Sequence, residues 1–444
     1  MLGEYRIEGR RASEIAESVE RGVGAGRLAP GAPLPPLREL AQRLGVNPNT
    51  VAAAYRTLRE RGVVETAGRK GTRVRARPAG TARESIGVEA PPGVRDISTG
   101  SPDPALLPSL GPALAAAAAR YDERPVLYGE APVDAELSRH ARRAFGLDGV
   151  PKGPVAATSG ALDAIERVLA AHLRPGDTVA VEDPGWGSLL DLVPALGLRA
   201  VPVAVDDEGP VPGEVERALD RGARALVVTC RAQNPTGAAV SGPRAAELRA
   251  VLAAHPRVLL VEDDHGHGFV HLPLYPLAGA TEHWALVRST AKAYGPDLRL
   301  ALLTGDDVTL DRVRGRQLLG PGWVSRLLQR AVVHLWTTGA VDPAAVARAY
   351  SERRDALVEA LAERGINAHG RSGMNVWVPV DDETGVVARL LRSGWAVAPG
   401  ARFRVSAPPG VRLTVSALGM DDIGLLADAV ASARGPVRAG VRYG

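Results

Sequence analysis

Lysine is rare in this chain, and one lysine stands where amine chemistry would be expected. Among 54 lysines and arginines only three are lysines: Lys70, Lys152 and Lys292. Arginine can replace a lysine that serves as a positive charge, but not one that serves as an amine, because a guanidinium is not deprotonated in proteins. Lys292 follows the apolar run Ala285–Ser289. It is therefore the candidate for covalent chemistry, whereas Lys152, between Pro151 and Gly153, is expected on the surface.

Other polar or small residues stand at the ends of neighbouring predicted strands. Asp263 ends an apolar strand, at the edge where open α/β sheets bind ligands. Asn234 lies on a turn after another strand, and Trp186 offers an aromatic face for stacking. The small residues of Thr158–Ala161 open a predicted helix, and backbone N–H groups at a helix N-terminus suit a phosphate.

One cofactor requires all of these groups together. Pyridoxal phosphate needs a lysine for a Schiff base, a carboxylate at its pyridine nitrogen and a phosphate site. It also needs a donor to its ring hydroxyl and a stacking aromatic side chain, and Arg299 is available for the phosphate. Structural interpretations stay open: Asp263 and Asp264 in a solvated acidic turn, Trp186 in the core, His265 as a structural histidine and Lys292 as a surface lysine.

From Asp96 onward, short apolar runs alternate with amphipathic helices. This pattern predicts an α/β fold with a mostly parallel sheet flanked by helices. After about residue 345 it predicts a small C-terminal α/β unit, with strands near Asn375–Val380 and Val411–Val415. The predicted strands of the larger unit are Val179–Glu182, Ala200–Val205, Ala225–Thr229, Val258–Glu262, Ala285–Ser289 and Ala301–Thr304.

The first 77 residues differ from the rest in charge and in pattern. They hold 15 lysines and arginines against 8 acidic residues, whereas the whole chain has a net charge of +4. Helical spacing predicts helices at Ser13–Gly24, Leu37–Leu44 and from Pro48 to about Arg61. The runs Val63–Thr66 and Thr72–Arg75 predict a hairpin. This order predicts a winged helix-turn-helix, although a purely structural helical cap stays open.

In such a unit the second helix of the motif enters the major groove of DNA and the wing reaches the minor groove or phosphates. The candidate DNA-contacting residues are Arg38, Asn47, Asn49, Thr50, Arg56, Arg69 and Lys70. Residues 78–95 are rich in proline and glycine and have no periodicity, so they predict a linker.

Both halves of the chain resemble known families. The stretch from Gly26 to Leu58 resembles the DNA-binding signature of the GntR superfamily. The motifs from about Asp96 to Ala433 resemble, in order and residue type, the fold-type I aminotransferases. Together they resemble the MocR-type (GabR-like) transcription regulators. The resemblance implies a winged helix at 1–77, a linker at 78–95 and, at 96–444, a pyridoxal phosphate-binding effector and dimerisation domain.

The resemblance to aminotransferases implies a role for each candidate residue. Lys292 would form the Schiff base, Asp263 would pair with the pyridine nitrogen and Asn234 would bond the ring hydroxyl. Trp186 would stack on the ring, and Arg412 would clamp a substrate or effector carboxylate; a structural ion pair is its other interpretation. The residues implied around the phosphate are Gly160, Ala161, Ser289 and Arg299, together with Tyr128, which would reach the phosphate of the neighbouring subunit.

Two positions depart from the aminotransferase pattern. His265 stands two residues after Asp263, where most of these proteins have a tyrosine that bonds the ring hydroxyl. A histidine can donate as well, but it titrates near neutrality. Ala161 lacks the hydroxyl often found at that phosphate position. The histidine is shared by PtsJ-like members of the family, which Leu127–Val133 and Val287–Ala301 also resemble.

The sequence therefore predicts a pyridoxal phosphate-dependent regulator of transcription. The resemblance implies a homodimer on operator DNA and a small effector, either an amino compound or a form of vitamin B6. Two alternatives stay open: a catalytic aminotransferase with an accessory DNA-binding domain, and a cofactor-free dimerisation scaffold.

Composition predicts where such a protein works. The longest apolar runs, such as Ala113–Ala119, fall short of the roughly 18 residues that span a bilayer. No membrane partner is therefore expected. The single cysteine, Cys230, cannot form an intrachain disulfide, which makes the cytoplasm the default location. No metal site is expected.

Overall fold

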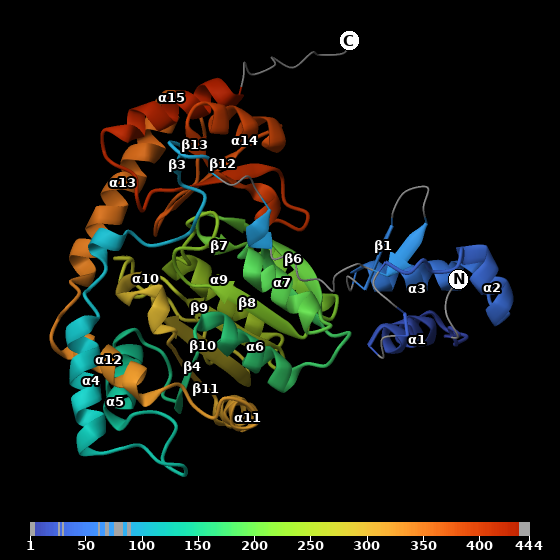
Figure 1. Ribbon diagram of the computed structural model, residues 1–444, viewed down its shortest axis with the longest axis horizontal. Helices are drawn as coiled ribbons and strands as arrows, with labels where there is room; N and C mark the ends of the chain where they lie inside the picture. Colours follow the sequence, from blue (N-terminus) through green and yellow to red (C-terminus); the bar gives the residue numbers. More distant parts are fainter. Residues whose placement is uncertain are drawn as a thin grey trace.

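The N-terminal residues form three helices and a short hairpin in the computed structural model (Figure 1). The structure describes residues 5–24, 27–28, 31–60, 63–66, 71–74, 83–86 and 90–434. The helices are α1 (Ala12–Gly24), α2 (Leu37–Leu44) and α3 (Pro48–Glu60), and the hairpin pairs β1 (Val64–Thr66) with β2 (Thr72–Val74). Arg69 and Lys70, the predicted tip of the wing, lie outside the described residues.

Helix α2 turns directly into α3, as a helix-turn-helix requires. Gly45 ends α2 with a φ of 65°, a left-handed conformation that glycine adopts at no steric cost. The apolar faces of the three helices meet in one core, in which Ile15, Leu40 and Val51 are almost fully buried. Tyr55 of α3 donates from its hydroxyl to the Pro35 carbonyl at 2.8 Å, which fixes α3 against the segment before α2.

An eight-stranded sheet forms the centre of the larger part of the chain, in the order β4-β11-β10-β9-β8-β5-β6-β7. Strands β10, β9, β8, β5 and β6 run parallel, whereas β11, β4 and β7 pair antiparallel with their neighbours. The predicted fold class, a mostly parallel sheet preceded by a winged helix, is confirmed. The strands are β4 (Val155–Thr158), β5 (Thr178–Asp183), β6 (Arg199–Asp206), β7 (Gly209–Pro210), β8 (Ala225–Thr229), β9 (Leu259–Asp264), β10 (His283–Ser289) and β11 (Ala301–Gly305).

Helices cover both faces of this sheet because its strands are apolar on both sides. Val227 and Val228, neighbours in β8, belong to two separate hydrophobic clusters. One cluster joins the sheet to α6, α7 and α11, and the other joins it to the remaining helices of this domain. The helices are α4 (Gly111–Glu123), α5 (Ala135–Leu147), α6 (Ala161–His172), α7 (Gly187–Ala195), α8 (Pro212–Asp220), α9 (Gly242–Ala253), α10 (Ala291–Tyr294), α11 (Asp307–Leu318) and α12 (Arg326–Thr337). None of the described helices is long and apolar enough to cross a membrane.

A smaller domain follows the long helix α13 (Pro343–Glu363). Its sheet has the order β12-β15-β14, and a second short sheet pairs β13 with β3, which comes from the chain just before the large domain. The elements are β3 (Arg95–Asp96), β12 (Asn375–Pro379), β13 (Trp395–Ala396), β14 (Ala398–Pro399), β15 (Gly410–Thr414), α14 (Glu383–Arg392) and α15 (Asp422–Arg434).

Candidate functional site

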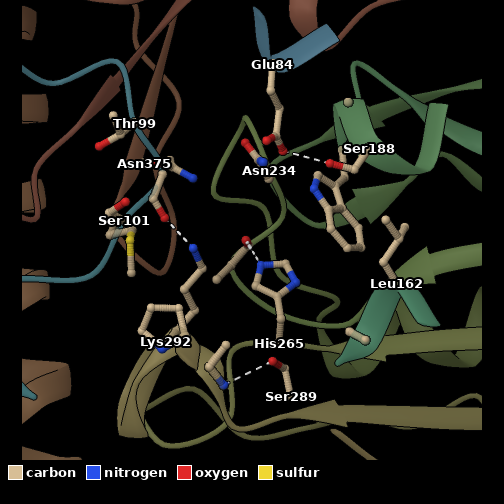
Figure 2. Close-up of a pocket in the computed structure, with 18 of the residues that line it drawn as sticks. Glu84, Thr99, Ser101, Leu162, Ser188, Asn234, His265, Ser289, Lys292 and Asn375 are labelled. Atoms are coloured by element: carbon tan, nitrogen blue, oxygen red, sulfur yellow. Dashed lines mark hydrogen bonds between the residues drawn. The ribbon is translucent and has the colours of Figure 1, made fainter. Parts of the chain in front are cut away.

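A cavity of about 550 Å³ lies where the carboxyl ends of β8, β9 and β10 face the small domain (Figure 2). This is the edge at which a parallel sheet of this kind binds its ligands. Ten of the eleven residues predicted around the cofactor and its substrate line this cavity. They are Gly160, Ala161, Trp186, Asn234, Asp263, His265, Ser289, Lys292, Arg299 and Arg412.

Asp263 offers the cavity a carboxylate oxygen that needs a partner. The residue is 3% exposed, and its Oδ2 lies 3.1 Å from His265 Nδ1. Its Oδ1 is buried and has no hydrogen-bond partner among the described residues. A buried carboxylate oxygen left unpaired is costly unless a ligand brings a donor. The N–H of a protonated pyridine ring fits this requirement, so the site fits pyridoxal phosphate at this atom.

His265 holds Asp263 in place. Its Nε2 lies 2.7 Å from the Ala232 carbonyl oxygen, and its Nδ1 faces the Asp263 carboxylate. The Ala232 carbonyl can only accept, so Nε2 donates to it, while Nδ1 lies within hydrogen-bond distance of the carboxylate. Burial lowers the pKa of His265, but the Asp263 carboxylate and the Ala232 carbonyl outweigh burial, and the pKa is raised. The expected donation from His265 to a ring hydroxyl therefore does not match this geometry, because neither nitrogen is free.

Lys292 reaches the cavity from α10, directly after β10. Its Nζ donates a hydrogen bond to the carbonyl oxygen of Gly100. Burial and the nearby Arg412 guanidinium lower the pKa of Lys292 to about 8, while Glu84 acts in the opposite direction. Both effects disfavour the charged ammonium. The amine can therefore lose its proton near neutral pH, which a nucleophilic lysine needs.

The N-terminus of α6 and Arg299 lie together at one end of the cavity, where their donors suit an anion. Gly160 precedes α6 with a φ of 102°, and a Cβ added there would lie 3.0 Å from an Arg299 guanidinium nitrogen. That guanidinium donates to the Ser159 carbonyl at 3.1 Å. The first N–H groups of a helix have no intrahelical acceptor, so they are available to a phosphate together with Arg299. Ser289 borders the same site, with its Oγ accepting from the Ala291 backbone at 3.2 Å.

Arg412 and Asn234 lie together on the side of the small domain. Arg412 is 3% exposed and donates to Asn234 Oδ1 at 2.9 Å and to the Ser98 carbonyl at 2.6 Å. Its Nε has no partner among the described residues. Burial and Arg402 lower the pKa of Arg412, since a buried cation is disfavoured. A ligand carboxylate would relieve that cost, and Asn234 keeps its amide nitrogen for another acceptor.

Two buried acids that were not predicted as site residues position their neighbours, and the burial of Asp264 rules out a solvated acidic turn. Asp264 receives hydrogen bonds from Arg231 and Arg288, which lower its pKa to about 2 although burial alone would raise it. Asp183, at the end of β5, accepts from the backbone N–H groups of Val405, Ser406 and Ala407 in the small domain. The only sequence signal for either was a carboxylate at the end of an apolar strand.

Tyr128 does not line the cavity of its own chain. It is 92% exposed, and its ring packs edge-on against the Trp323 ring, with 5.6 Å between the ring centroids. Its predicted role at the phosphate requires a second subunit, so it stays a prediction.

The predicted DNA-contacting side chains that the structure describes lie on α2, on α3 and, for Asn47, in the turn directly before α3. Arg38, Asn47, Asn49 and Arg56 are exposed, and Thr50 is half-buried. Asn47 Oδ1 accepts from the backbone N–H of Asn49 at 2.9 Å, and the exposed Asn49 side chain stands at the start of α3, the end of the helix that would face base edges. Val51 and Tyr55 point into the core, so α3 has one buried and one polar face.

Two families match the chain in the same order as these parts. Residues 11–74 match the bacterial regulatory proteins of the gntR family, and residues 104–430 match the aminotransferases of class I and II.

Two of the relatives are transcription regulators. The chain is 43% identical over 431 residues to the vitamin B6 salvage pathway transcriptional repressor PtsJ of Salmonella typhimurium, covering 95% of this chain and 98% of the relative. It is 30% identical to the HTH-type pyridoxine biosynthesis transcriptional regulator PdxR of Corynebacterium glutamicum, over 71% of this chain and 67% of the relative. A structure of aspartate aminotransferase from Thermus thermophilus with maleate superposes with a TM-score of 0.67 at 26% identity, covering 77% of this chain and 92% of that one.

Proposed function

We propose a vitamin B6-sensing role for this chain, which belongs to the aminotransferase class I and II family and carries a gntR-family DNA-binding domain. It is a transcription regulator with an aminotransferase-like domain for pyridoxal phosphate. In the proposed function, pyridoxal phosphate itself is the effector. Its binding changes the affinity of the winged helix for operator DNA near genes of vitamin B6 supply, which the chain represses. Such a regulator works in the cytoplasm.

The residues of the cavity fit each part of the cofactor. When bound, pyridoxal phosphate supplies an aldehyde that an amine captures reversibly and a ring that withdraws electrons. Lys292 supplies the amine, and its lowered pKa keeps part of it uncharged near neutral pH. Asp263 Oδ1 would accept a hydrogen bond from the ring N–H, and Trp186, which lines the cavity, would offer a stacking surface. The backbone at Gly160 and the Arg299 guanidinium would hold the phosphate, the first with N–H donors and the second with its positive charge.

In this proposal two winged helices, one from each subunit of a homodimer, bind the operator together. Tyr128 projects from the large domain and is 92% exposed, which suits a residue that completes the phosphate site of a second subunit. A homodimer brings two α3 helices to two half-sites of an operator, so spacing between the helices controls affinity. The effector changes DNA binding only if it binds one dimer conformation better than the other.

The single observation that carries this proposal is the unpaired Asp263 oxygen facing the same cavity as Lys292, in a chain similar to a B6 repressor over 95% of its length. The experiment is a DNA-binding titration on the DNA upstream of the protein's own gene, with apo and pyridoxal phosphate-loaded protein. Loading should change the affinity, and Lys292→Ala should abolish the change. Equal affinity of the apo and loaded wild-type protein would refute the effector role.

A further inference from the structure

Part of the predicted linker is bound to the large domain. Residues Arg83–Ile86, here called the strap, include the short 3-10 helix η2 (Arg83–Ser85). The Arg83 backbone N–H donates to Asp191 at 2.6 Å, and its guanidinium lies 3.2 Å from the same carboxylate. Glu84 accepts a hydrogen bond from Ser188 Oγ at 2.7 Å. The strap is thus fixed to α7, the helix that follows Trp186.

The strap is also bound to the small domain. The Arg83 guanidinium donates to the carbonyl oxygens of Ala401 at 3.2 Å and Arg404 at 2.9 Å. In return, Arg402 of the 3-10 helix η5 (Gly400–Arg402) donates to the Ile86 carbonyl. Gly187 makes room for this junction, because a Cβ there would lie 2.6 Å from the Arg402 carbonyl. Four residues of the linker therefore bridge two domains, and one of them, Glu84, lines the cavity.

Glu84 points from the strap into the cavity (Figure 2). Its carboxylate lines the same cavity as Lys292, Arg402 and Arg412. It opposes the effect of burial on all three cations, acting to raise the pKa of each. A carboxylate of this chain thus compensates the cationic side of the cavity where a ligand carboxylate would bind.

A continuous chain of hydrogen bonds joins the ligand side of the cavity to the strap. The Ser98 carbonyl accepts from Arg412 at 2.6 Å and from Arg402 at 3.3 Å. Arg402 then donates to the Ile86 carbonyl of the strap. Contiguous networks of this kind carry coupling when they have two arrangements. A ligand that draws Arg412 toward itself therefore disturbs the Ser98 carbonyl, which also accepts from Arg402. Arg402 in turn holds the strap through the Ile86 carbonyl.

We infer that the strap closes the cavity in competition with an amine that carries a carboxylate, so that binding of such a ligand releases the chain leading to the winged helix. This inference deepens the proposed function, on which it rests, by naming the ligand class that acts on the loaded protein. The ligand carboxylate replaces the Glu84 carboxylate near Arg402 and Arg412. Release then exposes Arg83 and the peptide bond that follows it.

Trypsin cleavage after Arg83 measures release of the strap without using DNA. The full-length, pyridoxal phosphate-loaded protein is digested briefly, and the fragment that begins at Glu84 is quantified by mass spectrometry. The probes are L-alanine and ethylamine, which differ by the carboxylate. L-alanine should raise the rate of this cleavage about tenfold, the scale of one lost charge-assisted hydrogen bond, and ethylamine should not. An unchanged rate with L-alanine, or an equal increase with ethylamine, would overturn the inference.

Variants separate the strap from a general loosening of the fold. Glu84→Gln and Asp191→Asn each weaken one anchor, so both should be cleaved faster than wild type without any amine. Glu216→Gln is the matched control, because Glu216 is an exposed glutamate on α8, outside the cavity and the strap. It should be cleaved like wild type after Arg83. Cleavage of Glu84→Gln at the wild-type rate would contradict the role of Glu84.

DNA binding distinguishes failure of this inference from failure of the proposed function. Without any amine, the loaded Glu84→Gln variant should have the affinity for operator DNA that the loaded wild-type protein has with L-alanine. Adding L-alanine should not change the affinity of the variant further. If pyridoxal phosphate changes DNA affinity but Glu84→Gln behaves as wild type, the strap inference fails and the proposed function stands. If pyridoxal phosphate has no effect on DNA affinity, the proposed function fails whatever the cleavage pattern shows.

Discussion

The pKa of Lys292 is the property of the pocket that can be tested most sharply. Burial and Arg412 lower this pKa to about 8, from an ordinary value of 10.5. At pH 7.5 about a quarter of the Lys292 amines are then uncharged, against about one in a thousand for an ordinary lysine. Because Arg412 contributes to the lowering and Glu84 opposes it, Arg412→Gln should raise the pKa and Glu84→Gln should lower it further.

The scarcity of lysine makes the measurement simple. Protein labelled with ¹³C-lysine gives one side-chain Cε signal for each of its three lysines. Lys292→Ala identifies the signal of Lys292, and its chemical shift is followed in the apo protein from pH 6 to pH 11. Glu216→Gln, which removes the same charge as Glu84→Gln but far from the pocket, should leave the titration unchanged. A Lys292 signal that titrates at the ordinary lysine value would refute the reasoning, as would a lowered pKa in Arg412→Gln or a raised pKa in Glu84→Gln.

Three further predictions address the ring, the phosphate and the DNA, and a fourth addresses stability. Asp263→Asn should weaken pyridoxal phosphate binding about tenfold to a hundredfold in an absorbance titration, because a charge-assisted hydrogen bond to the ring is lost, and unchanged affinity would count against this role. Gly160→Ala should weaken binding of pyridoxal phosphate but not of pyridoxal, since its Cβ would lie 3.0 Å from Arg299; equal losses for both would place the phosphate elsewhere. Asn49→Ala should lower the affinity for the operator by about tenfold and leave binding to random DNA intact, as measured by fluorescence anisotropy; a uniform loss would indicate a phosphate contact. Burial raises the pKa of Glu262 to about 7, above the unfolded value of 4.5, so the folded state loses stability as pH rises from about 5 to 8. The melting temperature of Glu262→Gln minus that of wild type should therefore be larger at pH 8 than at pH 5. A difference that does not depend on pH would contradict this.

The position of the pocket followed from the sequence because strand ends carry polar residues. Asp263 and Lys292 each follow an apolar run, and parallel strands bring their carboxyl ends to one edge of a sheet. Local patterns of this kind need no knowledge of distant contacts. The winged helix was predictable for the same reason, since its helices and hairpin are short-range features.

Features that depend on distant partners were not predictable. Strand β9 was expected to end at Glu262, but it continues to Asp264 because Arg231 and Arg288 neutralise that buried carboxylate. The role of His265 depends on the carbonyl of Ala232, which is 33 residues away. A sequence pattern shows which residue types are present, but not which acceptor lies beside each ring nitrogen.

The strap shows the same limit in a segment that looked structureless. Composition predicted a linker at 78–95, and nothing local indicates that Arg83 binds Asp191 or the carbonyl of Arg404. These partners lie 108 and 321 residues away. Their contacts are specific to the folded chain, so only the structure could assign this part of the linker to the pocket.

The central claim is that pyridoxal phosphate bound at Lys292 controls DNA binding, and one titration tests it most directly. Fluorescence anisotropy of labelled upstream DNA is followed while pyridoxal phosphate is added, and cofactor absorbance is recorded in the same samples. For the wild-type protein, the DNA-binding change and the absorbance change should share one midpoint, and Lys292→Ala should show neither. A DNA response that persists in Lys292→Ala, or cofactor binding without any DNA response in the wild type, would contradict the account.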